Sequence, residues 1–396
     1  MFDYAIIGGG VVGSAILNKL TRLKQRCLLI ELQEDIAAGA SKANSGLVHA
    51  GFDAAPNTLK AKLNVAGHRM MKKLASELKI DYKQIGALVC GTLQDREKLK
   101  ELLERGKQNK VKGLSIIGEK KLFKLAPNLN KEQKLALWAK TAGIISPYKF
   151  AIALCEEAAL NGAQIKLGCQ ITKVVRTEKN VFSIFANGQT FAAKKIINCS
   201  GAGFNDVSTL LGCENFPLSF RRGEYFVLDK AATSPLTSIT VFPLPTIKGK
   251  GILATPTIDG NILLGPTSEA SLLDTKTTAE GLLEIKKGII KLFDNFPSNQ
   301  TIREYSGIRV QCGSDFIIQK STINENVLNI CGIDSPGLSS APAIAVYVAL
   351  LLGLDLKEKK MIRRKKQIVT NSLSKKKLDK LVKKDPLYGK IVCKCE

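Results

Sequence analysis

Near the start of the chain, the spacing of the apolar residues changes from that of a strand to that of a helix and then back. Residues 4–9 (YAIIGG) and 27–31 (CLLIE) are short apolar runs. Between them, residues 11–24 have apolar side chains at helical spacing, namely Val12, Ala15, Ile16, Leu20 and Leu23. A short apolar run is typical of a buried strand, so this order predicts a strand, a helix and a second strand. Such a unit is the building block of a parallel sheet.

Longer periodic segments predict the elements that follow. Amphipathic helices are expected at residues 57–79, 95–109, 118–127 and 278–294. Residues 216–265 are rich in strand patterns, and the sequence DGN at 259–261 is typical of a hairpin turn. Residues 326–354 predict a strand, a glycine-containing loop and a buried helix with Pro342 in its first turn.

Segments of the nucleotide-binding type therefore occur at the start, the middle and the end of the chain. The predicted fold class is α/β, with a discontinuous doubly wound (Rossmann-like) domain and an inserted β-rich substrate domain. The first domain is expected to comprise residues 1–85, 148–213 and 300–355, and the second residues 86–147 and 214–299. The highly charged residues 356–396 are expected to form a basic tail outside the main core.

Composition narrows the class of protein. The chain of 396 residues is 45% hydrophobic and 24% charged, which is ordinary for a globular protein. No apolar run reaches the roughly 18 residues of a membrane span, and the first residues lack the pattern of a signal peptide. The ten cysteines mostly lie far apart, several of them inside apolar runs. We therefore expect a cytoplasmic protein with reduced, buried thiols, no disulfide framework and no metal site.

The formal net charge of +24 has two explanations. A surplus of lysine attracts anions, such as a phosphorylated substrate, an acidic membrane surface or nucleic acid. It can equally reflect a lysine-rich composition spread over solvated helix faces, and we favour this explanation for most of the lysines. No basic motif is interleaved with aromatic residues, so nucleic acid is not an expected partner.

Gly8, Gly10 and Gly13 form the pattern G-x-G-x-x-G between the first predicted strand and its helix. Glycine at these positions permits a tight turn, close approach of a pyrophosphate and close packing of the helix on the sheet. The helix N-terminus attracts phosphate, and Glu31 after the second strand can accept hydrogen bonds from a ribose. The pattern alone does not separate NAD from FAD, but the late glycine-containing loop at 332–337 favours a flavoprotein.

Several stretches of the chain together resemble one enzyme family, the D-amino-acid-oxidase superfamily of FAD enzymes. They are GGGVVG, SKANSGLVHAG, RRGEYFVLDK, FPLPTIKGKGILATPTIDGNILLGPT, DFII and GIDSPGLSSAPA, and they occur in this order. Within the superfamily, the resemblance is closest to the glycerol-3-phosphate oxidase and dehydrogenase group. L-2-hydroxyglutarate oxidases share the Asn-Ser-Gly-x-x-His segment. The stretches therefore identify the superfamily more clearly than they identify the substrate.

The resemblance implies a role for each matched position. The residues implied to hold the ADP part of FAD are Val12, Gly13, Glu31, Ala40 and Ser41, with the main chain of Ile171 at the adenine. Those implied to line the flavin are Ser45, Gly46, Leu47, Ile333, Asp334 and Ser339. Those implied to contact the substrate are Ser45, His49, Lys250, Arg309 and Ser335. His49 is the implied catalytic base.

The chemistry of these residue types agrees with the implied roles. Oxidation of a secondary alcohol needs a hydride acceptor, which flavin N5 supplies, and a base for the hydroxyl proton. His49 suits the second task because histidine titrates near neutral pH. Lys250 offers a point charge and Arg309 a planar fork for an anion. The expected reaction converts sn-glycerol 3-phosphate to dihydroxyacetone phosphate, and oxidation of L-2-hydroxyglutarate or a related 2-hydroxy acid is the alternative.

Three further residues are harder to assign from the sequence. His68 lies among lysines in the predicted helix 57–79 and is expected to be structural. Arg221 and Arg222 belong to a stretch that matches the family. The sequence leaves open whether they face the substrate or brace a sheet.

The end of the chain departs from the pattern of the family. Relatives continue into a domain with a four-cysteine [2Fe–2S] cluster, which begins with Cys-x-Cys-Glu after a segment like DPLYGKIV. Here Cys393 and Cys395 match the first two ligands, and two thiolates cannot complete a cluster, so none is expected in this chain. A truncated chain, a cluster shared with another polypeptide and a relic remain alternatives.

The electron acceptor is equally open, with oxygen, a quinone or a partner protein as candidates. A different class of function would make the protein an electron-transfer subunit that docks through its tail. The basic run 357–366 would then contact an acidic partner or a membrane surface.

Overall fold

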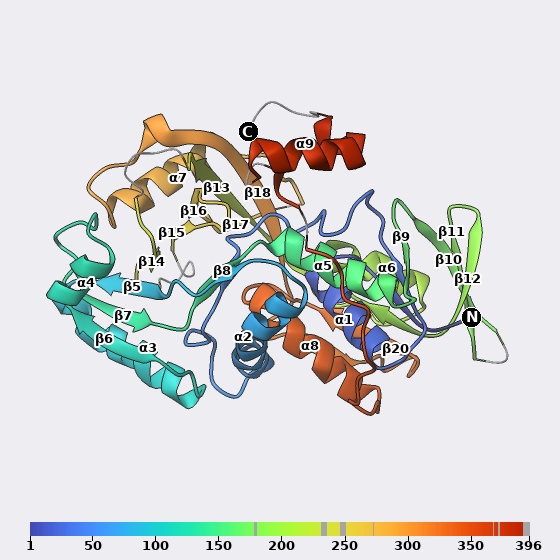
Figure 1. Ribbon diagram of the computed structural model, residues 1–396. Coiled ribbons are helices and arrows are strands. Elements are labelled where there is room, and N and C mark those ends of the chain that lie inside the picture. The colour runs from blue at the N-terminus through green and yellow to red at the C-terminus, as the bar shows by residue number, and fades with distance from the viewer. Residues whose placement is uncertain are drawn as a thin grey trace.

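The computed structural model describes residues 1–177, 180–230, 236–245, 251–271, 273–366, 368–370 and 373–390. Within these ranges the chain forms an eight-stranded sheet, a nine-stranded sheet and a three-stranded sheet. The eight-stranded sheet lies on the right in Figure 1 and the nine-stranded sheet on the left.

The eight-stranded sheet has a parallel centre, as the opening strand–helix–strand pattern predicts. Strands β20, β12, β1, β2 and β9 run parallel in that order, and β10, β11 and β19 are antiparallel additions. The bounds are β1 Phe2–Ile7, β2 Cys27–Ile30, β9 Gln164–Lys166, β10 Ile171–Arg176, β11 Phe182–Ala186, β12 Gln189–Asn198, β19 Ile317–Lys320 and β20 Val327–Cys331.

Both faces of this sheet are covered. Tyr4, Ile6 and Leu29 belong to the core beneath α1 (Val11–Arg22), α5 (Pro147–Leu160) and α8 (Gly337–Leu351). The alternate residues Ala5, Ile7, Leu28 and Ile30 pack with β11 and with residues around α6 (Phe204–Leu210). A strand buried on both faces reads as a continuous apolar run, which is why the sequence predicted these strands correctly. The predicted α/β class is confirmed.

The nine-stranded sheet contains the β-rich insert. Its strands are β5 Ala87–Gly91, β6 Leu114–Gly118, β7 Leu135–Ala139, β13 Ser219–Leu228, β14 Thr240–Phe242, β15 Leu253–Pro256, β16 Ile262–Gly265, β17 Glu269–Ala270 and β18 Thr301–Gln311. Strands β15 and β16 form the hairpin predicted around the turn 259–261. The residues of β18 were expected in the first domain, but β18 pairs with β13 along nearly its whole length. The local pattern of a strand does not reveal its partner.

The remaining helices mostly follow the predicted ranges. α2 (Leu59–Glu77) begins after Thr58, whose hydroxyl accepts a hydrogen bond from the Ala61 N–H at 3.1 Å. The others are α3 Arg96–Gln108, α4 Glu119–Leu125, α7 Ala279–Ile290 and α9 Lys375–Lys384, with short 3₁₀ segments at Leu93–Asp95, Gly201–Gly203, Ser298–Gln300 and Pro386–Gly389. The three-stranded sheet consists of β3 Leu47–Val48, β4 Tyr82–Lys83 and β8 Gly143–Ile145.

The start of α8 differs from the prediction. The helix begins at Gly337 after Pro336, so Pro342 lies inside the helix and not in its first turn. The apolar run gives no signal for the exact start, because the glycine-containing loop and the first helical turn have the same small residues. Among the described residues, none of the helices has both the length and the apolar character that crossing a bilayer requires.

Residues 357–366, which we call the C-terminal strap, are packed against the first domain and do not lie outside the core as expected. The Lys359 N–H donates to the Arg22 carbonyl at 2.8 Å. Arg364 is buried, and its Nε donates to Glu156 at 2.6 Å. The prediction failed because a charged segment reads as solvent-exposed when its partners are distant in the sequence.

The strap completes an ion network around Glu157 of α5, which is fully buried. Its carboxylate accepts hydrogen bonds from Arg22 at 2.6 Å, Arg363 at 2.7 Å and Asn18 at 3.0 Å. A carboxylate in a low-dielectric interior is tolerated only with such partners. The network thereby ties α1, α5 and the strap together.

We expect Glu157→Ala to lower the free energy of unfolding by about 3 kcal/mol, because it removes a buried partner from Arg22. The measurement is the urea-unfolding midpoint followed by circular dichroism. Glu97→Ala is the control, since the Glu97 side chain is 74% exposed in its pair with Lys100. Its expected effect is below about 1 kcal/mol. Equal midpoints for the two variants would contradict a structural role of the network.

Candidate active site

The turn between β1 and α1 requires glycine at two of the three predicted positions. Gly8 has a φ of +109°, and a Cβ there would lie 2.5 Å from the Cys199 carbonyl oxygen. A Cβ on Gly13 would collide with the carbonyl oxygen of Gly8. The glycines therefore allow α1 to begin directly against the sheet edge.

The residues predicted to hold the ADP part of a dinucleotide surround this turn. Glu31 follows β2, and its carboxylate accepts a hydrogen bond from the Gly9 N–H at 2.5 Å. The Ser41 Oγ accepts one from the Val11 N–H at 2.9 Å. Gly10 precedes α1 without a capping side chain, and Ser41 binds the Val11 N–H, so among the described residues the N–H groups of Val12 and Gly13 are left for an anion. This set of backbone donors and one carboxylate fits a pyrophosphate with an adjoining ribose.

Ile171 lies close to the same turn. The segment just before it pairs with the chain after β2, since the Cys169 N–H donates to the Glu31 carbonyl at 2.9 Å. Ile171 begins β10 two residues later. The structure therefore brings the predicted adenine contact to the side of the turn where Glu31 lies.

A second cluster unites the predicted flavin-side segments 45–49 and 332–339, which we call the first and second flavin-side loops. The His49 N–H donates to Ser339 Oγ at 2.8 Å, and Ser339 Oγ donates to the Leu47 carbonyl at 3.4 Å. Gly46 has a φ of +65°, and a Cβ there would lie 2.6 Å from the Ile145 carbonyl oxygen. These contacts hold the base candidate against the start of α8.

The His49 ring lies 6.1 Å from the ring of Phe242, centroid to centroid. A cavity of about 170 Å³ lies beside it, and its lining includes His49, Lys60, Asn64 and Ser335. The candidate base and one predicted substrate residue, Ser335, thus share one small cavity.

His68, the other histidine of the chain, contacts the main chain of His49 from α2. Burial lowers the pKa of His68, while a hydrogen bond with the His49 backbone raises it. With its amide in the orientation that satisfies both neighbours, the Asn64 side chain donates to the His49 carbonyl at 3.2 Å and accepts from the Gly51 N–H at 3.3 Å. His68 thus lies against the main chain of the candidate base, and its structural role stays a prediction. Asn64 is a neighbouring residue that the sequence analysis missed.

The β13–β18 pair faces both flavin-side loops. Tyr225 and Tyr305 stack across the two strands with centroids 4.8 Å apart. The Tyr305 hydroxyl donates to the Asn44 carbonyl at 3.2 Å, and the Tyr225 hydroxyl hydrogen-bonds the Ser45 side chain. On the same strand, Gln311 donates to the Asp334 carboxylate at 2.8 Å.

Arg309 lies on β18 between these contacts. One of its terminal nitrogens donates to the Thr267 carbonyl, and its buried Nε has no hydrogen-bond partner among the described residues. Burial lowers the pKa of Arg309, and the neighbouring Arg221 lowers it further, against the opposing effects of Tyr225 and Asp334. An arginine stays protonated in proteins, so the site keeps its positive charge.

Lys60 is a second site-lining residue that the sequence analysis missed. Its ammonium lies 2.6 Å from the Asp334 carboxylate, and its side chain is 14% exposed. Nothing in the amphipathic pattern of the helix distinguishes this lysine from its exposed neighbours. The return of the chain at residue 334 gives it a carboxylate partner, and its ammonium also lies 5.5 Å from the centroid of the Phe316 ring.

Some predicted residues fall outside the cluster. Arg222 braces the insert, because it pairs with Glu224 at 3.0 Å and Glu269 at 3.2 Å. Lys250, Cys393 and Cys395 lie outside the described residues. Ala40 lies in the turn beside Ser41. The Ala40 carbonyl accepts a hydrogen bond from the Ala43 N–H at 3.3 Å.

Comparisons with known proteins show what the chain as a whole is similar to. A family model described as FAD dependent oxidoreductase matches residues 3–351. A glycerol 3-phosphate dehydrogenase of Caloramator mitchellensis is 38% identical over 100% of this chain and 84% of its own length. A mitochondrial L-2-hydroxyglutarate dehydrogenase of Arabidopsis thaliana is 27% identical over 88% of this chain and 82% of its own. The FAD-bound structure of Mycoplasma pneumoniae L-alpha-glycerophosphate oxidase matches with a TM-score of 0.85 and 28% identity, covering 90% of this chain and 96% of that one.

We expect Gly13→Ala to weaken flavin binding at least about tenfold, equivalent to about 1.4 kcal/mol, because the new Cβ displaces the Gly8 carbonyl. The measurement is the ratio of flavin to protein absorbance after dialysis. Gly118→Ala is the matched control, because a Cβ there meets nothing within 4 Å. A Gly13→Ala protein that retains the same flavin content as the control would contradict the role of the turn.

Proposed function

This chain belongs to the family of FAD dependent oxidoreductases, and on that premise we propose that it oxidises sn-glycerol 3-phosphate to dihydroxyacetone phosphate. The observation that carries the proposal is that His49 and Arg309 both approach the second flavin-side loop. His49 shares a cavity with Ser335, and Arg309 interacts with Asp334. A base and a cation on the two sides of one loop suit a small anionic alcohol.

FAD supplies the hydride acceptor when it is bound. On this proposal, Gly8, Gly10, Gly13, Glu31 and Ser41 hold its ADP part, as the donor set of the turn suggests. The first flavin-side loop, with Ser45, Gly46 and Leu47, would lie along the flavin. Small residues suit this task because they let the main chain approach a flat ring.

His49 would take the proton of the substrate hydroxyl. Its main chain is held on both sides, by Ser339 at the N–H and by Asn64 at the carbonyl. A base with a fixed main chain loses little conformational freedom when the substrate arrives. The tilted contact with Phe242 further limits where the ring can turn.

Arg309 would bind the anionic group of the substrate. Its Nε is buried, no described residue offers it an acceptor, and an unsatisfied buried donor costs about 1–3 kcal/mol. A phosphate oxygen at this position would remove that cost. Lys250 remains a proposed second cation for the same group.

The alternative substrate is L-2-hydroxyglutarate, which the Arabidopsis relative oxidises according to its name. A carboxylate would also pair with Arg309, so the cation alone does not discriminate. The higher identity and full coverage of the glycerol 3-phosphate dehydrogenase favour the phosphate substrate.

The test is anaerobic mixing of the holoenzyme with each substrate. We expect glycerol 3-phosphate to bleach the flavin absorbance, and His49→Ala to bind FAD but to be reduced about 10²- to 10⁴-fold more slowly, because it lacks the base. The control is His68→Asn, which removes the other imidazole and should slow reduction less than about tenfold. Bleaching by a 2-hydroxy acid and not by glycerol 3-phosphate would overturn the substrate, and wild-type reduction by His49→Ala would overturn the base.

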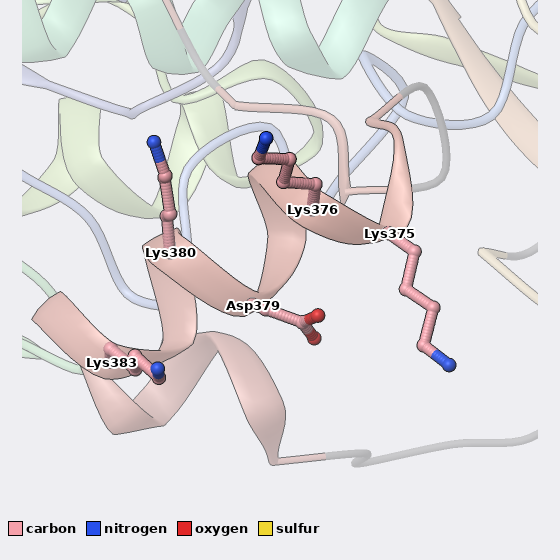
Figure 2. A pocket seen from close by; sticks show the side chains of 5 residues that line it. All are labelled: Lys375, Lys376, Asp379, Lys380 and Lys383. Carbon is pink, nitrogen blue, oxygen red and sulfur yellow. The ribbon is translucent and has the colours of Figure 1, made fainter.

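We further propose that α9, rather than the strap, gives the protein a peripheral contact with an anionic membrane surface. The strap arginines already pair with Glu156 and Glu157. In contrast, the lysines of α9 are exposed, and Figure 2 shows Lys376 and Lys380 projecting together from one side of the helix. Leu387, just after the helix, is 74% exposed. Exposed lysines next to an exposed apolar side chain are typical of interfacial helices.

We expect the triple variant Lys375→Gln, Lys376→Gln, Lys380→Gln to lose most binding to vesicles that contain phosphatidylserine, since each lysine contributes about 1 kcal/mol near such a surface. Vesicle co-sedimentation measures the loss, and flavin reduction in solution should be unchanged. The matched control replaces the exposed lysines of α3, Lys98, Lys100 and Lys107, by glutamine. Equal losses in both variants would indicate an effect of net charge alone and contradict a role of α9.

A further inference from the structure

The register of β13 and β18 places two arginines directly opposite each other. Arg221 and Arg309 are partners across the antiparallel pair. Opposite residues of such a pair project on the same face, with their Cβ atoms about 4.5–5.5 Å apart. Like charges in this relation destabilise a sheet. The pair therefore needs an explanation other than folding.

The two guanidinium groups also converge at their ends. Arg221 donates to the Oγ of Ser268 at 2.8 Å and to its carbonyl at 2.5 Å. Arg309 donates to the carbonyl of Thr267, the preceding residue. Within the described ranges, neither arginine forms an ion pair with a carboxylate within 4.0 Å. The main chain thus holds two cations side by side, and the described residues give neither of them a directly paired carboxylate. The more distant Asp334 partly offsets the charge of Arg309.

The neighbouring Arg222 of the same strand differs from Arg221, because carboxylates compensate its charge. Its side chain projects on the other face of β13, where Glu224, Glu269 and Asp274 surround it at 3.0, 3.2 and 3.7 Å. Adjacent arginines of one strand therefore have opposite environments. Among the described residues, the face directed at the flavin-side loops is the one on which the arginine of β13 has no paired carboxylate.

The face of β13 and β18 that includes Arg221 and Arg309 is the one that would contact an anionic substrate. On the same face, Tyr305 hydrogen-bonds Asn44, which directly precedes the first flavin-side loop, and Gln311 hydrogen-bonds Asp334 of the second. Arg221 and Arg309 lie within this stretch of the sheet. An anion bound between them would be close to both loops.

We propose that Arg221 and Arg309 together form a two-guanidinium site for the phosphate group of the substrate, with Arg221 as the residue that determines specificity. The inference rests on the proposed function and deepens it. A phosphate monoester carries nearly two negative charges at neutral pH on three acceptor oxygens, whereas a carboxylate carries one charge on two. Two forks side by side match the first group better than the second.

The test combines reduction kinetics and direct anion binding to the holoenzyme. For Arg221→Gln, the glycerol 3-phosphate concentration that half-saturates flavin reduction should rise about 10- to 100-fold, with less than about a threefold change in the limiting rate. Arg221→Lys, which keeps the charge without the fork, should give an intermediate value. Arg303→Gln removes an exposed arginine of the same strand β18 and should behave as wild type.

Isothermal titration with inorganic phosphate separates this inference from the proposed function. The wild-type holoenzyme should bind phosphate, and Arg221→Gln should bind it at least about tenfold more weakly, with an unfolding midpoint in the absence of phosphate that is no lower than that of the wild type. Wild-type affinity in Arg221→Gln, or no detectable phosphate binding to the wild-type holoenzyme, would overturn the site. If phosphate binds as expected but glycerol 3-phosphate does not reduce the flavin, the site stands and the proposed substrate fails.

Discussion

The position of the candidate anion site relative to the candidate base depends on contacts of β18 with residues 43–44 and with Asp334 of the first domain. A side chain at Gly307 would collide with the Ala43 carbonyl, so glycine permits the closest of these approaches. Tyr305 and Gln311 add hydrogen bonds to Asn44 and Asp334. These residues alternate along one strand and therefore share a face, which also includes Arg309. The cation is thus placed by a rigid strand and not by a flexible loop.

The first domain meets a different requirement, which is to keep α1 fixed at both ends. At its N-terminus, the glycine turn lets the helix begin against the sheet edge. Near its C-terminus, Asn18 and Arg22 bond to the buried Glu157 of α5, and the strap supplies Arg363 to the same carboxylate. Because a buried ion network is rigid when all its members are paired, the network holds the helix that presents its N-terminus to the cofactor.

Features that depend on short stretches were predictable from the sequence, and features that depend on distant partners were not. The glycine turn and the helix predicted at 57–79 have their signals within a few adjacent residues, so both were found. The membership of β18 in the second sheet depends on its pairing with β13, which no local period encodes. Lys60, Asn64 and the strap were missed or misplaced for the same reason, because each acquires its role from a residue far along the chain. The start of α8 failed differently, since small residues suit both a loop and a helical turn.

In this protein, the presence or absence of a carboxylate partner for each cation is more informative than the net charge. A formal charge of +24 says little about the site, because most lysines are spread over exposed faces. The informative distinction is between cations that the fold pairs with carboxylates and cations that it does not. Arg22, Arg222, Arg363 and Arg364 each have a carboxylate partner. Arg221 and Arg309 are held by main-chain carbonyls instead, which orient a guanidinium without cancelling its charge. Positive charge that is oriented, adjacent and not directly paired with a carboxylate of the described residues costs stability in the free protein, and binding of an anion recovers that cost.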